Sequence, residues 1–396
     1  MTPHQRKISA LVSSLVDWFS QKARDLPWRR TRDPYAIWVS EIMLQQTQVK
    51  TVLPFWERWM RELPTIEAVA HASSDKIHKL WEGLGYYHRV RNLQKAAQMI
   101  LEKHDGKFPE KFEDVLALPG IGRYTAGAIC SIAFNQPTPI LDGNVMRVLT
   151  RVFGIEKDPR EKETNQLLWR LAEDLVSHAK EPRGTWQAKA PRDSTRQLAT
   201  RAGTRKIDKN KLKLELQPSC SHLNQSLMEL GALVCTPRNP QCVICPVKRL
   251  CVAFKTHRVA ELPNLGKRAA ATARRFMAFV VEHRGKFLVR QRPEDVVNAH
   301  LWEFPNVELN GHAANPVEVF KSRFGFAPPE LLPLPPVKHS ITRYRITLEA
   351  FRVPLKAALK TPGGTWLAHS QFDSVAFTAA HKKLANFEVN RILAGR

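Results

Sequence analysis

The chain has 396 residues, and its 61 Lys and Arg residues against 37 Asp and Glu residues give a formal net charge of +24 at pH 7. Because 43% of the residues are hydrophobic and ten are Trp, the chain can bury the cores of two or three domains and is not a disordered polyelectrolyte. Its apolar runs are too short for a transmembrane helix of about 18 residues, which excludes an integral membrane protein. The charge predicts a polyanionic partner, with nucleic acid ahead of an anionic membrane surface or a basic surface that contacts only solvent.

The N-terminal part of the chain shows a helical pattern. Apolar residues recur at helical spacing over residues 8–19 and are interrupted by Asp17, which predicts an amphipathic helix and not a signal peptide. We therefore expect a cytoplasmic protein. The pattern continues over residues 35–178, punctuated by Pro and Gly, and returns at 222–234. These segments predict one mainly helical domain over residues 1–257.

This helical pattern is interrupted at about residues 182–218, where the apolar periodicity fades. Within the interruption, residues 183–213 hold ten Lys or Arg residues against two Asp residues and so carry +8 of the net charge. We expect a flexible basic insert that attracts DNA phosphates. The alternative is a loop that never touches DNA.

Six cysteines are present, and four of them are separated by six, two and five residues: Cys235, Cys242, Cys245 and Cys251. A disulfide framework is not expected in a large chain without an export signal. Zinc sites usually pair two C-x-x-C motifs, and one is present here, whereas four thiolates in a compact loop suit a 4Fe-4S cluster. The spacing favours the cluster over zinc, with inert cysteines as a third alternative.

The pattern changes again after the cysteines. We interpret residues 258–272 as a linker and residues 273–396 as a separate α+β module. β-Branched and alternating patterns predict strands at residues 276–281, 286–290 and 345–353. Residues 328–336 are rich in Pro and are expected to form a connection.

Two glycines, Gly120 and Gly122, lie in the segment LPGIGRYTA (118–126), between a short predicted helix and a longer apolar one. A hairpin at this point presents backbone N–H groups at a helix N-terminus, where they can bind a phosphate without reading a base. The segment predicts a helix-hairpin-helix motif. An ordinary glycine-rich helix junction is the alternative.

Three further segments add to the hairpin and the cysteine spacing: WVSEIMLQQT (38–47), GLGYY (83–87) and ILDGNV (140–145). In this combination and order, the chain resembles the MutY-type adenine DNA glycosylases of the helix-hairpin-helix superfamily. The resemblance spans nearly the whole chain except the basic insert, and it is weaker in the C-terminal module. It implies a mainly α helix-hairpin-helix glycosylase core with an iron-sulfur cluster loop, followed by an α+β Nudix-like domain.

Glu41 lies among apolar residues of a predicted helix, where loss of water should raise its pKa and keep it protonated, as a general acid for base release requires. A structural Glu paired with an Arg is the alternative. Asp142 precedes a predicted helix at residues 143–153 and suits its N-cap. The resemblance implies that Asp142 also stabilises an oxocarbenium-like sugar, with Asn144 as a support.

Tyr124 distinguishes between two related reactions. At this position the resembling bifunctional enzymes carry a Lys whose amine forms a Schiff base with the sugar and then nicks the strand. A phenol cannot form that imine. We therefore predict a monofunctional glycosylase that leaves an abasic site.

The resemblance also implies how the target base leaves the duplex. Gln45 would enter the vacated stack, and Tyr86 would wedge beside the opposite base. Roles in the adenine pocket are implied for Trp28, Arg29 and Gln225. Ordinary core packing is the alternative for the aromatic residues.

In the C-terminal module, the run LWEFP (301–305) supports the resemblance to a Nudix-like domain that senses 8-oxoguanine opposite adenine. No cluster of glutamates occurs at residues 317–326, so we predict no pyrophosphatase activity. The family's lesion-reading loop is commonly Phe-Ser-His, and this chain offers Ile341, Thr342 and Arg343. Thr342 keeps the hydroxyl, so a lesion preference is expected, although the loop differs on both sides of it.

We therefore expect a monomeric DNA repair glycosylase that acts on double-stranded DNA containing A:8-oxoG or A:G mispairs, at the nucleoid of a bacterium. Two alternatives stay open. One is an endonuclease III-like pyrimidine glycosylase and lyase, which Tyr124 opposes. The other is a non-catalytic iron-sulfur DNA-binding protein, which Glu41 and Asp142 oppose.

Overall fold

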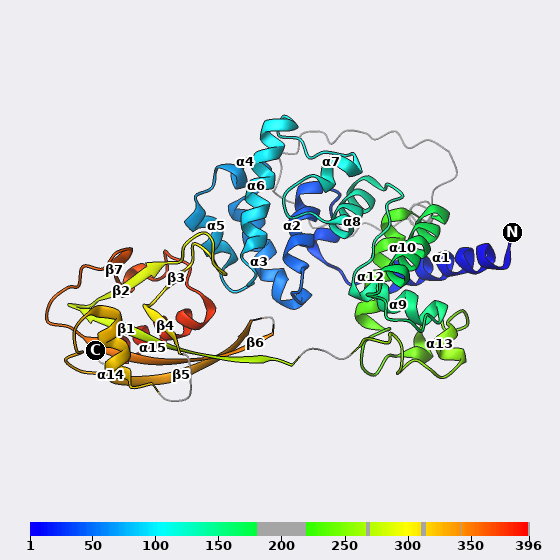
Figure 1. Cartoon of the computed structure of the whole chain (residues 1–396). Helices are drawn as coiled ribbons and strands as arrows, with labels where there is room; N and C mark the ends of the chain where they lie inside the picture. Colours follow the sequence, from blue (N-terminus) through cyan, green and yellow to red (C-terminus); the bar gives the residue numbers. More distant parts are fainter. Residues whose placement is uncertain (180–218, 267–269, 310–313, 342, 395–396) are drawn as a thin grey trace. The chain divides into compact units, whose positions relative to one another are not determined.

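The computed structural model describes residues 1–179, 219–266, 270–309, 314–341 and 343–394. The predicted basic insert and Thr342 lie outside these described residues. The chain forms two compact units, each built from two separate stretches of sequence (Figure 1). The first unit joins Met1–Ile42 to Phe108–Gly266, and the second unit joins Met43–Lys107 to Lys267–Arg396.

The first unit is helical where it is described. Its elements are α1 (Pro3–Lys22), η1 (Pro27–Arg29), α2 (Pro34–Leu44, whose last two residues belong to the second unit), α7 (Phe112–Leu116), α8 (Arg123–Phe134), α9 (Gly143–Phe153), α10 (Lys162–His178), α12 (Cys220–Leu233), η2 (Cys242–Ile244) and α13 (Val252–Lys255). A capping box starts α1, in which the Thr2 hydroxyl and the Gln5 side chain each accept the other's backbone N–H. The apolar face of α1 then packs with α10 and α12 into one core.

The predicted helix-hairpin-helix motif is present as α7, a hairpin over residues 118–122, and α8. Gly120 has a φ of +79°, a backbone conformation that favours glycine. Gly122 is the N-cap of α8, and a Cβ added there would meet nothing within 4 Å. The N-terminus of α8 therefore has free space beside its backbone N–H groups.

A glycine also allows α12 to approach α9 closely. A Cβ added at Gly231 would lie 2.6 Å from the Cβ of Asn144, which is too short for two carbon atoms. α9 occupies the predicted range, beginning after Asp142 and ending at Gly154, whose φ is +68°. Asn144 in its first turn is thus held against the backbone of α12.

The second unit begins with helices and continues into a sheet. Its first helices are α3 (Val49–Glu62), α4 (Ile66–His71), α5 (Ser74–Trp81) and α6 (His88–Lys103). Trp59 of α3 and Trp81 of α5 are fully buried and meet edge to face, with ring centroids 5.7 Å apart. After α5, Gly83 and Gly85 take positive φ values, which forms the tight loop that leads to α6.

In its described residues, the C-terminal part of this unit contains a mixed sheet of seven strands. The strands are β1 (Thr272–His283), β2 (Lys286–Gln291), β3 (Trp302–Glu303), β4 (Asn306–Leu309), β5 (Leu332–Ile341), β6 (Tyr344–Pro354) and β7 (Gly364–Ala368). The order is β3-β2-β1-β6-β5, with β4 paired to β1 and β7 to β2, and β1 runs parallel to β6.

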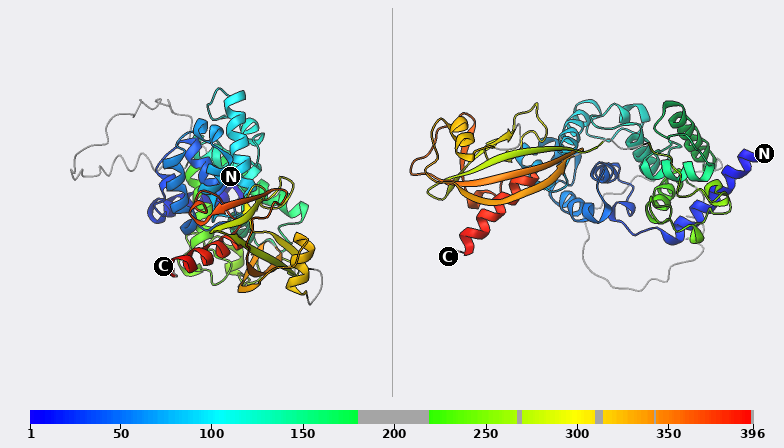
Figure 2. Two further views of the ribbon diagram at one scale, coloured as in Figure 1. Left: turned by 90° about the vertical axis from the view of Figure 1, so that its left-hand side faces the viewer. Right: turned by 60° about the horizontal axis from the view of Figure 1, so that its bottom comes forward.

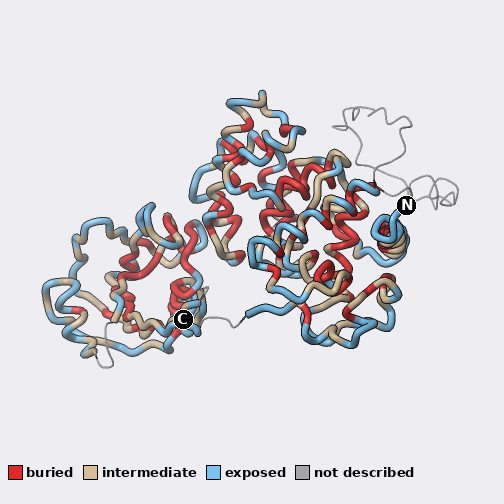
Figure 3. The backbone as a smooth tube through the Cα atoms, turned by 45° about the vertical axis from the view of Figure 1, so that its right-hand side comes forward, coloured by how far each residue is buried: buried red, intermediate tan, exposed pale blue. Residues whose placement is uncertain are grey.

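Helices cover both faces of this sheet, α14 (Pro316–Phe324) on one and α15 (Ala379–Ala394) on the other (Figure 2). Successive side chains of β1 point to opposite faces of the sheet, which explains why a helix packs on each face. Phe279 packs with Phe320 of α14, while Val280 packs with Leu384 of α15. Buried positions accordingly gather inside the layers, and exposed positions follow the loops (Figure 3).

The prediction of a Pro-rich connection at residues 328–336 is wrong from Leu332 onward, because β5 begins there and runs through three prolines. β5 is an edge strand that pairs only with β6 in the described sheet. Its proline nitrogens, which carry no hydrogen, can therefore lie on the side that has no partner strand. The register shifts between Leu334 and Val337, where Pro335 and Pro336 lie.

Among the residues described, the structure contains no helix that is both long and apolar enough to cross a membrane.

Candidate active site and DNA interface

Glu41 lies on α2 inside the first unit, with 6% of its surface exposed. The Tyr124 hydroxyl donates a 3.0 Å hydrogen bond to its Oε2 atom. Burial raises the pKa of Glu41 from its ordinary value of 4.5 to about 7, and the negative charge of Asp142 acts in the same direction. The hydrogen bond from Tyr124 opposes this rise. The site therefore places a carboxyl group that holds a proton near neutral pH beside a second carboxylate.

Asp142 is the N-cap of α9, because its Oδ1 atom accepts the Val145 N–H at 2.7 Å. Its Oδ2 atom accepts a 2.8 Å hydrogen bond from Asn144 Nδ2. Burial raises the pKa of Asp142, while these hydrogen bonds oppose the rise. The N-cap interpretation is confirmed, and the same cap fixes the direction in which the carboxylate points.

Tyr124 lies in the first turn of α8, directly after the hairpin. Burial raises the pKa of its hydroxyl well above the usual value, and the charge of Glu41 adds to this effect. The hydroxyl also lies 3.2 Å from the Met228 Sδ atom. Tyr124 therefore stays neutral and donates its proton to the hydrogen bond with Glu41.

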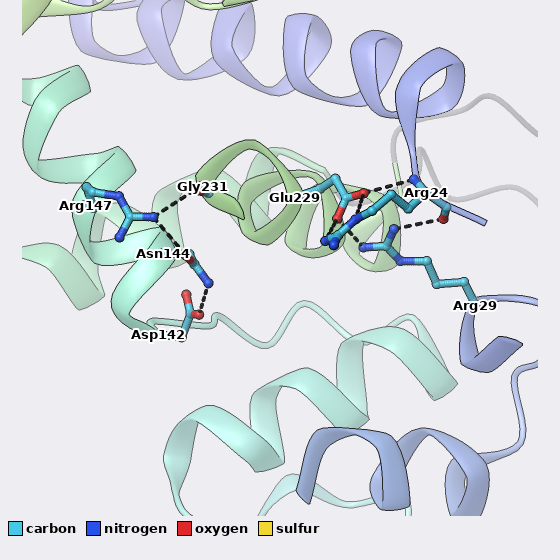
Figure 4. A network of polar contacts seen from close by, with 7 residues as sticks. All are labelled: Arg24, Arg29, Asp142, Asn144, Arg147, Glu229 and Gly231. Atoms are coloured by element: carbon cyan, nitrogen blue, oxygen red, sulfur yellow. Dashed lines mark hydrogen bonds and ion pairs between the residues drawn. The ribbon is translucent and has the colours of Figure 1, made fainter. Parts of the chain in front are cut away.

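Arg29 and Gln225 make polar contacts of their own in the first unit. The Arg29 guanidinium donates to Glu229 at 2.9 Å, and Arg24 donates to the same carboxylate from two guanidinium nitrogens and from its backbone N–H (Figure 4). Burial alone would raise the pKa of Glu229, but these arginines lower it to about 2. The Gln225 amide donates to Ser221 Oγ at 3.1 Å on the same helix, α12.

Trp28 is 6% exposed and lies in η1, directly before Arg29. The sequence analysis missed Glu229, although the single acidic residue of a segment without Lys or Arg, four positions after Gln225, was a usable signal. Its carboxylate holds Arg29, and with it η1, on α12.

Arg147 was also missed, and it links the cysteine loop to Asp142. Its guanidinium donates to the backbone oxygen of Cys235 at 2.7 Å. It also donates to the Gly231 oxygen at 2.8 Å and to Asn144 Oδ1 at 2.9 Å (Figure 4). Asn144 in turn donates a hydrogen bond to the Asp142 carboxylate. The support role predicted for Asn144 thus has a physical basis in a continuous chain of hydrogen bonds.

The four predicted ligand cysteines line one cavity, whose other walls are mostly apolar and include Val148, Val152, Leu230 and Val247. Arg151 reaches this cavity, and its Nη1 atom donates a 3.4 Å hydrogen bond to the Cys235 sulfur. In the described part of the chain, no three His, Cys, Asp or Glu side chains form a group that could hold a single metal ion. Four thiols around a cavity suit a group with several metal atoms.

The second unit carries Gln45, predicted to enter the vacated stack, and Tyr86, predicted to wedge beside the opposite base. Gln45 and Tyr86 lie on neighbouring loops, and Tyr86 has a φ of +48°. Buried Arg89 joins the loops, because its guanidinium donates to the backbone oxygens of Gln45 at 2.7 Å and of Gly85 at 3.0 Å. Burial lowers the pKa of Arg89 to about 10, so it remains charged at neutral pH. Arg89 was not identified from the sequence.

Comparisons with known families agree with this layout. Residues 39–174 match the HhH-GPD superfamily of base excision DNA repair proteins. Residues 235–251 match the iron-sulfur binding domain of endonuclease III, and residues 276–386 match the NUDIX domain. The fold and the site therefore define an iron-sulfur DNA glycosylase of the helix-hairpin-helix superfamily, with a 4Fe-4S cluster as its cofactor.

Full-length relatives narrow the assignment. The chain is 33% identical to mouse adenine DNA glycosylase over 437 aligned positions, covering 95% of this chain and 77% of the mouse protein. Adenine DNA glycosylase from Buchnera aphidicola (subsp. Schizaphis graminum) is also 33% identical, with 74% of each chain covered. The solved structure of a thermostable thymine-DNA glycosylase matches with a TM-score of 0.50 and 26% identity, over 64% of this chain and all of that one. The chain belongs to the adenine DNA glycosylase family.

Proposed function

We propose that this enzyme excises adenine paired with 8-oxoguanine or guanine in duplex DNA and leaves an abasic site. The observation that carries the proposal is the buried Glu41 carboxyl group, with a pKa of about 7, hydrogen-bonded to Tyr124 and influenced by the charge of Asp142. A proton donor and a carboxylate that act on one site are what cleavage of an N-glycosidic bond requires.

In the proposed reaction, Glu41 donates its proton to a ring nitrogen of the flipped adenine, so that the base leaves as a neutral molecule. Positive charge then develops on the sugar. The Asp142 carboxylate, held by its cap and by Asn144, stabilises this oxocarbenium-like centre until water adds to it and gives up a proton, which restores the protonated form of Glu41. Asp142 also acts on Glu41, because its negative charge favours the protonated form of the acid.

The DNA contacts follow the same assignment. Gly120 and Gly122 of the hairpin present backbone N–H groups to a phosphate. Gln45 enters the vacated stack and Tyr86 wedges beside the opposite base, while the adenine lies against the residues predicted for its pocket: Trp28, Arg29 and Gln225. Arg89 supports this assignment, because it holds the Gln45 and Tyr86 loops in one arrangement.

We assign Cys235, Cys242, Cys245 and Cys251 as the ligands of the 4Fe-4S cluster. When bound, the cluster supplies a covalent cross-link among its four cysteines and so orders the loop between them. The loop in turn fixes the Cys235 carbonyl that Arg147 binds. The enzyme is proposed to act as a monomer, with its C-terminal domain reading the base opposite adenine and Thr342 contributing to that reading.

Three duplexes test the proposal: adenine opposite 8-oxoguanine, adenine opposite guanine, and an oxidised pyrimidine, each incubated with and without alkali. Strand cleavage at adenine that depends on alkali is expected, with no cleavage at the pyrimidine. Glu41→Gln should lower base release by orders of magnitude, and the exposed Glu62→Gln should not. Cleavage at the pyrimidine without alkali would replace the proposal with the glycosylase and lyase alternative.

Tyr124 provides a second test of the same chemistry. Borohydride should trap no covalent complex of the wild-type enzyme with DNA, because no amine is placed at this position. Tyr124→Lys supplies the amine, and trapping should then appear. Efficient trapping by the wild type would exclude monofunctional action.

A further inference from the structure

Glu82 lies directly between α5 and the Gly83–Tyr86 loop, and its carboxylate contacts the C-terminal part of the second unit. Oε1 accepts the backbone N–H of Phe377 at 3.0 Å. Oε2 accepts a 2.8 Å hydrogen bond from Lys79 and lies 3.5 Å from the Lys382 ammonium of α15. Only 14% of the side chain is exposed. A shielded carboxylate with three such partners is a strong electrostatic attachment point.

The groups that Glu82 binds are rigid. Phe377 is fully buried and stacks on Phe304, with ring centroids 5.7 Å apart. Its neighbours Ala376 and Thr378 exchange backbone hydrogen bonds with Trp302 of β3. Lys79 adds a second link, since its ammonium also donates to the Val375 oxygen at 3.1 Å. Glu82 is therefore attached to the core of the Nudix-like sheet and not to a surface loop.

The loop on the other side of Glu82 has little freedom. Gly83, Gly85 and Tyr86 all have positive φ values, and a Cβ at Gly83 would lie 3.1 Å from the Phe55 ring. Arg89 binds the backbone oxygens of Leu84 and Gly85. A movement of Glu82 therefore also moves Tyr86, four residues later, because the loop between them has little freedom to change conformation.

We propose that Glu82 is a positioning residue through which the C-terminal domain sets the placement of Tyr86. When that domain engages the base opposite adenine, its attachment to Glu82 holds the wedge in the position that favours base release. The inference rests on the proposed function, and it predicts a dependence on the opposite base: Glu82 assists excision opposite 8-oxoguanine far more than excision opposite guanine.

The test is single-turnover base release at saturating enzyme, which does not depend on the fraction of active protein. Glu82→Ala should slow release opposite 8-oxoguanine about tenfold and change release opposite guanine less than twofold. Glu82→Gln should lose less, because an amide oxygen can still accept the Phe377 N–H. The matched control is Glu62→Ala, which removes a carboxylate paired at the surface with Arg61 and should leave both rates unchanged.

Lys382→Met removes the ammonium group that faces Glu82 from the C-terminal domain and leaves Glu82 itself unchanged. It should reduce the preference for 8-oxoguanine in the same direction, and the Glu82→Ala/Lys382→Met double variant should lose no more than Glu82→Ala alone. Equal losses on both duplexes would reduce Glu82 to a structural residue and overturn the inference, as would fully additive losses. If the wild type releases no adenine from either duplex, the proposed function itself has failed, which is a distinguishable result.

Discussion

Burial favours the protonated form of the Glu41 carboxyl group, because the ionised form would lack the hydration that it has in water, and a single hydrogen bond from a neutral hydroxyl replaces little of it. The pKa is about 7 in the folded protein, above the ordinary value of 4.5. The folded state therefore binds the proton more tightly than the unfolded chain. This stabilisation is fully present below pH 4.5 and is lost as the pH rises through 7, a change of roughly 3 kcal/mol.

Glu41→Gln cannot ionise, so it should gain stability relative to the wild type as the pH rises. We expect the difference in the free energy of unfolding to grow by roughly 3 kcal/mol in favour of the variant between pH 4 and pH 8. Urea denaturation at the two pH values measures it. A difference independent of pH would mean that Glu41 titrates normally.

Tyr124→Phe should shift the pH dependence of base release upward. The Tyr124 hydroxyl favours the ionised form of Glu41, so removing it raises the pKa of the acid further. The alkaline fall in kcat/KM, which reports deprotonation of the free enzyme's acid, should then occur at higher pH than in the wild type. A fall displaced to lower pH would show that another group controls this limb.

At this scale the sequence indicated individual groups but not their pairing. Glu41 could be identified from its apolar neighbours, and Asp142 from its place before a helix. The bond between Tyr124 and Glu41 joins residues 83 positions apart, and the contacts of Glu229 with Arg24 and Arg29 span 200 or more. No local pattern encodes such distances, so only the fold reveals them.

Among the elements, the crossing of α9 and α12 is set by Gly231. Gly231→Ala places a methyl group against Asn144 and should separate the helices, at a cost of roughly 1–3 kcal/mol in unfolding free energy. Because Asn144 holds the Asp142 carboxylate, single-turnover base release should slow as well. Gly143→Ala, on the first turn of α9 with nothing within 4 Å, is the matched control and should change stability by less than about 1 kcal/mol. Equal effects of the two substitutions would indicate helix propensity and not the crossing.

The ends of helices and strands could be predicted from the sequence where neighbouring residues determine them. α9 begins and ends as predicted because Asp142 and Gly154 are strong caps. β5 was missed because its prolines argue against a strand, and its pairing with β6 is a long-range interaction. Its edge position makes those prolines tolerable, and a sequence pattern does not show which strand lies at an edge.

For the whole molecule, the order of the family matches along the chain agrees with the fold class expected from the sequence. The boundaries predicted near residues 257 and 272 stay a prediction. The grouping of Met43–Lys107 with the C-terminal residues could not be foreseen, because contacts such as that between Glu82 and Phe377 join positions 295 residues apart. Such contacts join the Gly83–Tyr86 loop, through Glu82, to the C-terminal residues, and the inference on Glu82 is based on them.

The cysteine cavity allows a prediction with an internal control, because the chain holds two sets of cysteines. Purified protein should be brown and contain about four iron atoms per chain, since four thiolates hold one 4Fe-4S cluster. Cys242→Ala should lose most of the iron and, through Cys235 and Arg147, slow base release. Cys130→Ala removes a fully buried thiol from α8, outside the cavity, and should keep wild-type iron content.

Iron and zinc analysis, visible absorption and single-turnover excision on the same preparations measure these effects. Because the cluster loop also bears the Cys235 carbonyl that orders Asn144, iron loss and slowed chemistry should occur together in Cys242→Ala and be absent in Cys130→Ala. Active wild-type protein with stoichiometric zinc and no iron would reverse the assignment of the cluster. A Cys242→Ala protein that loses iron but releases adenine at the wild-type rate would show that the hydrogen-bond chain from Cys235 to Asp142 holds its geometry without the cluster.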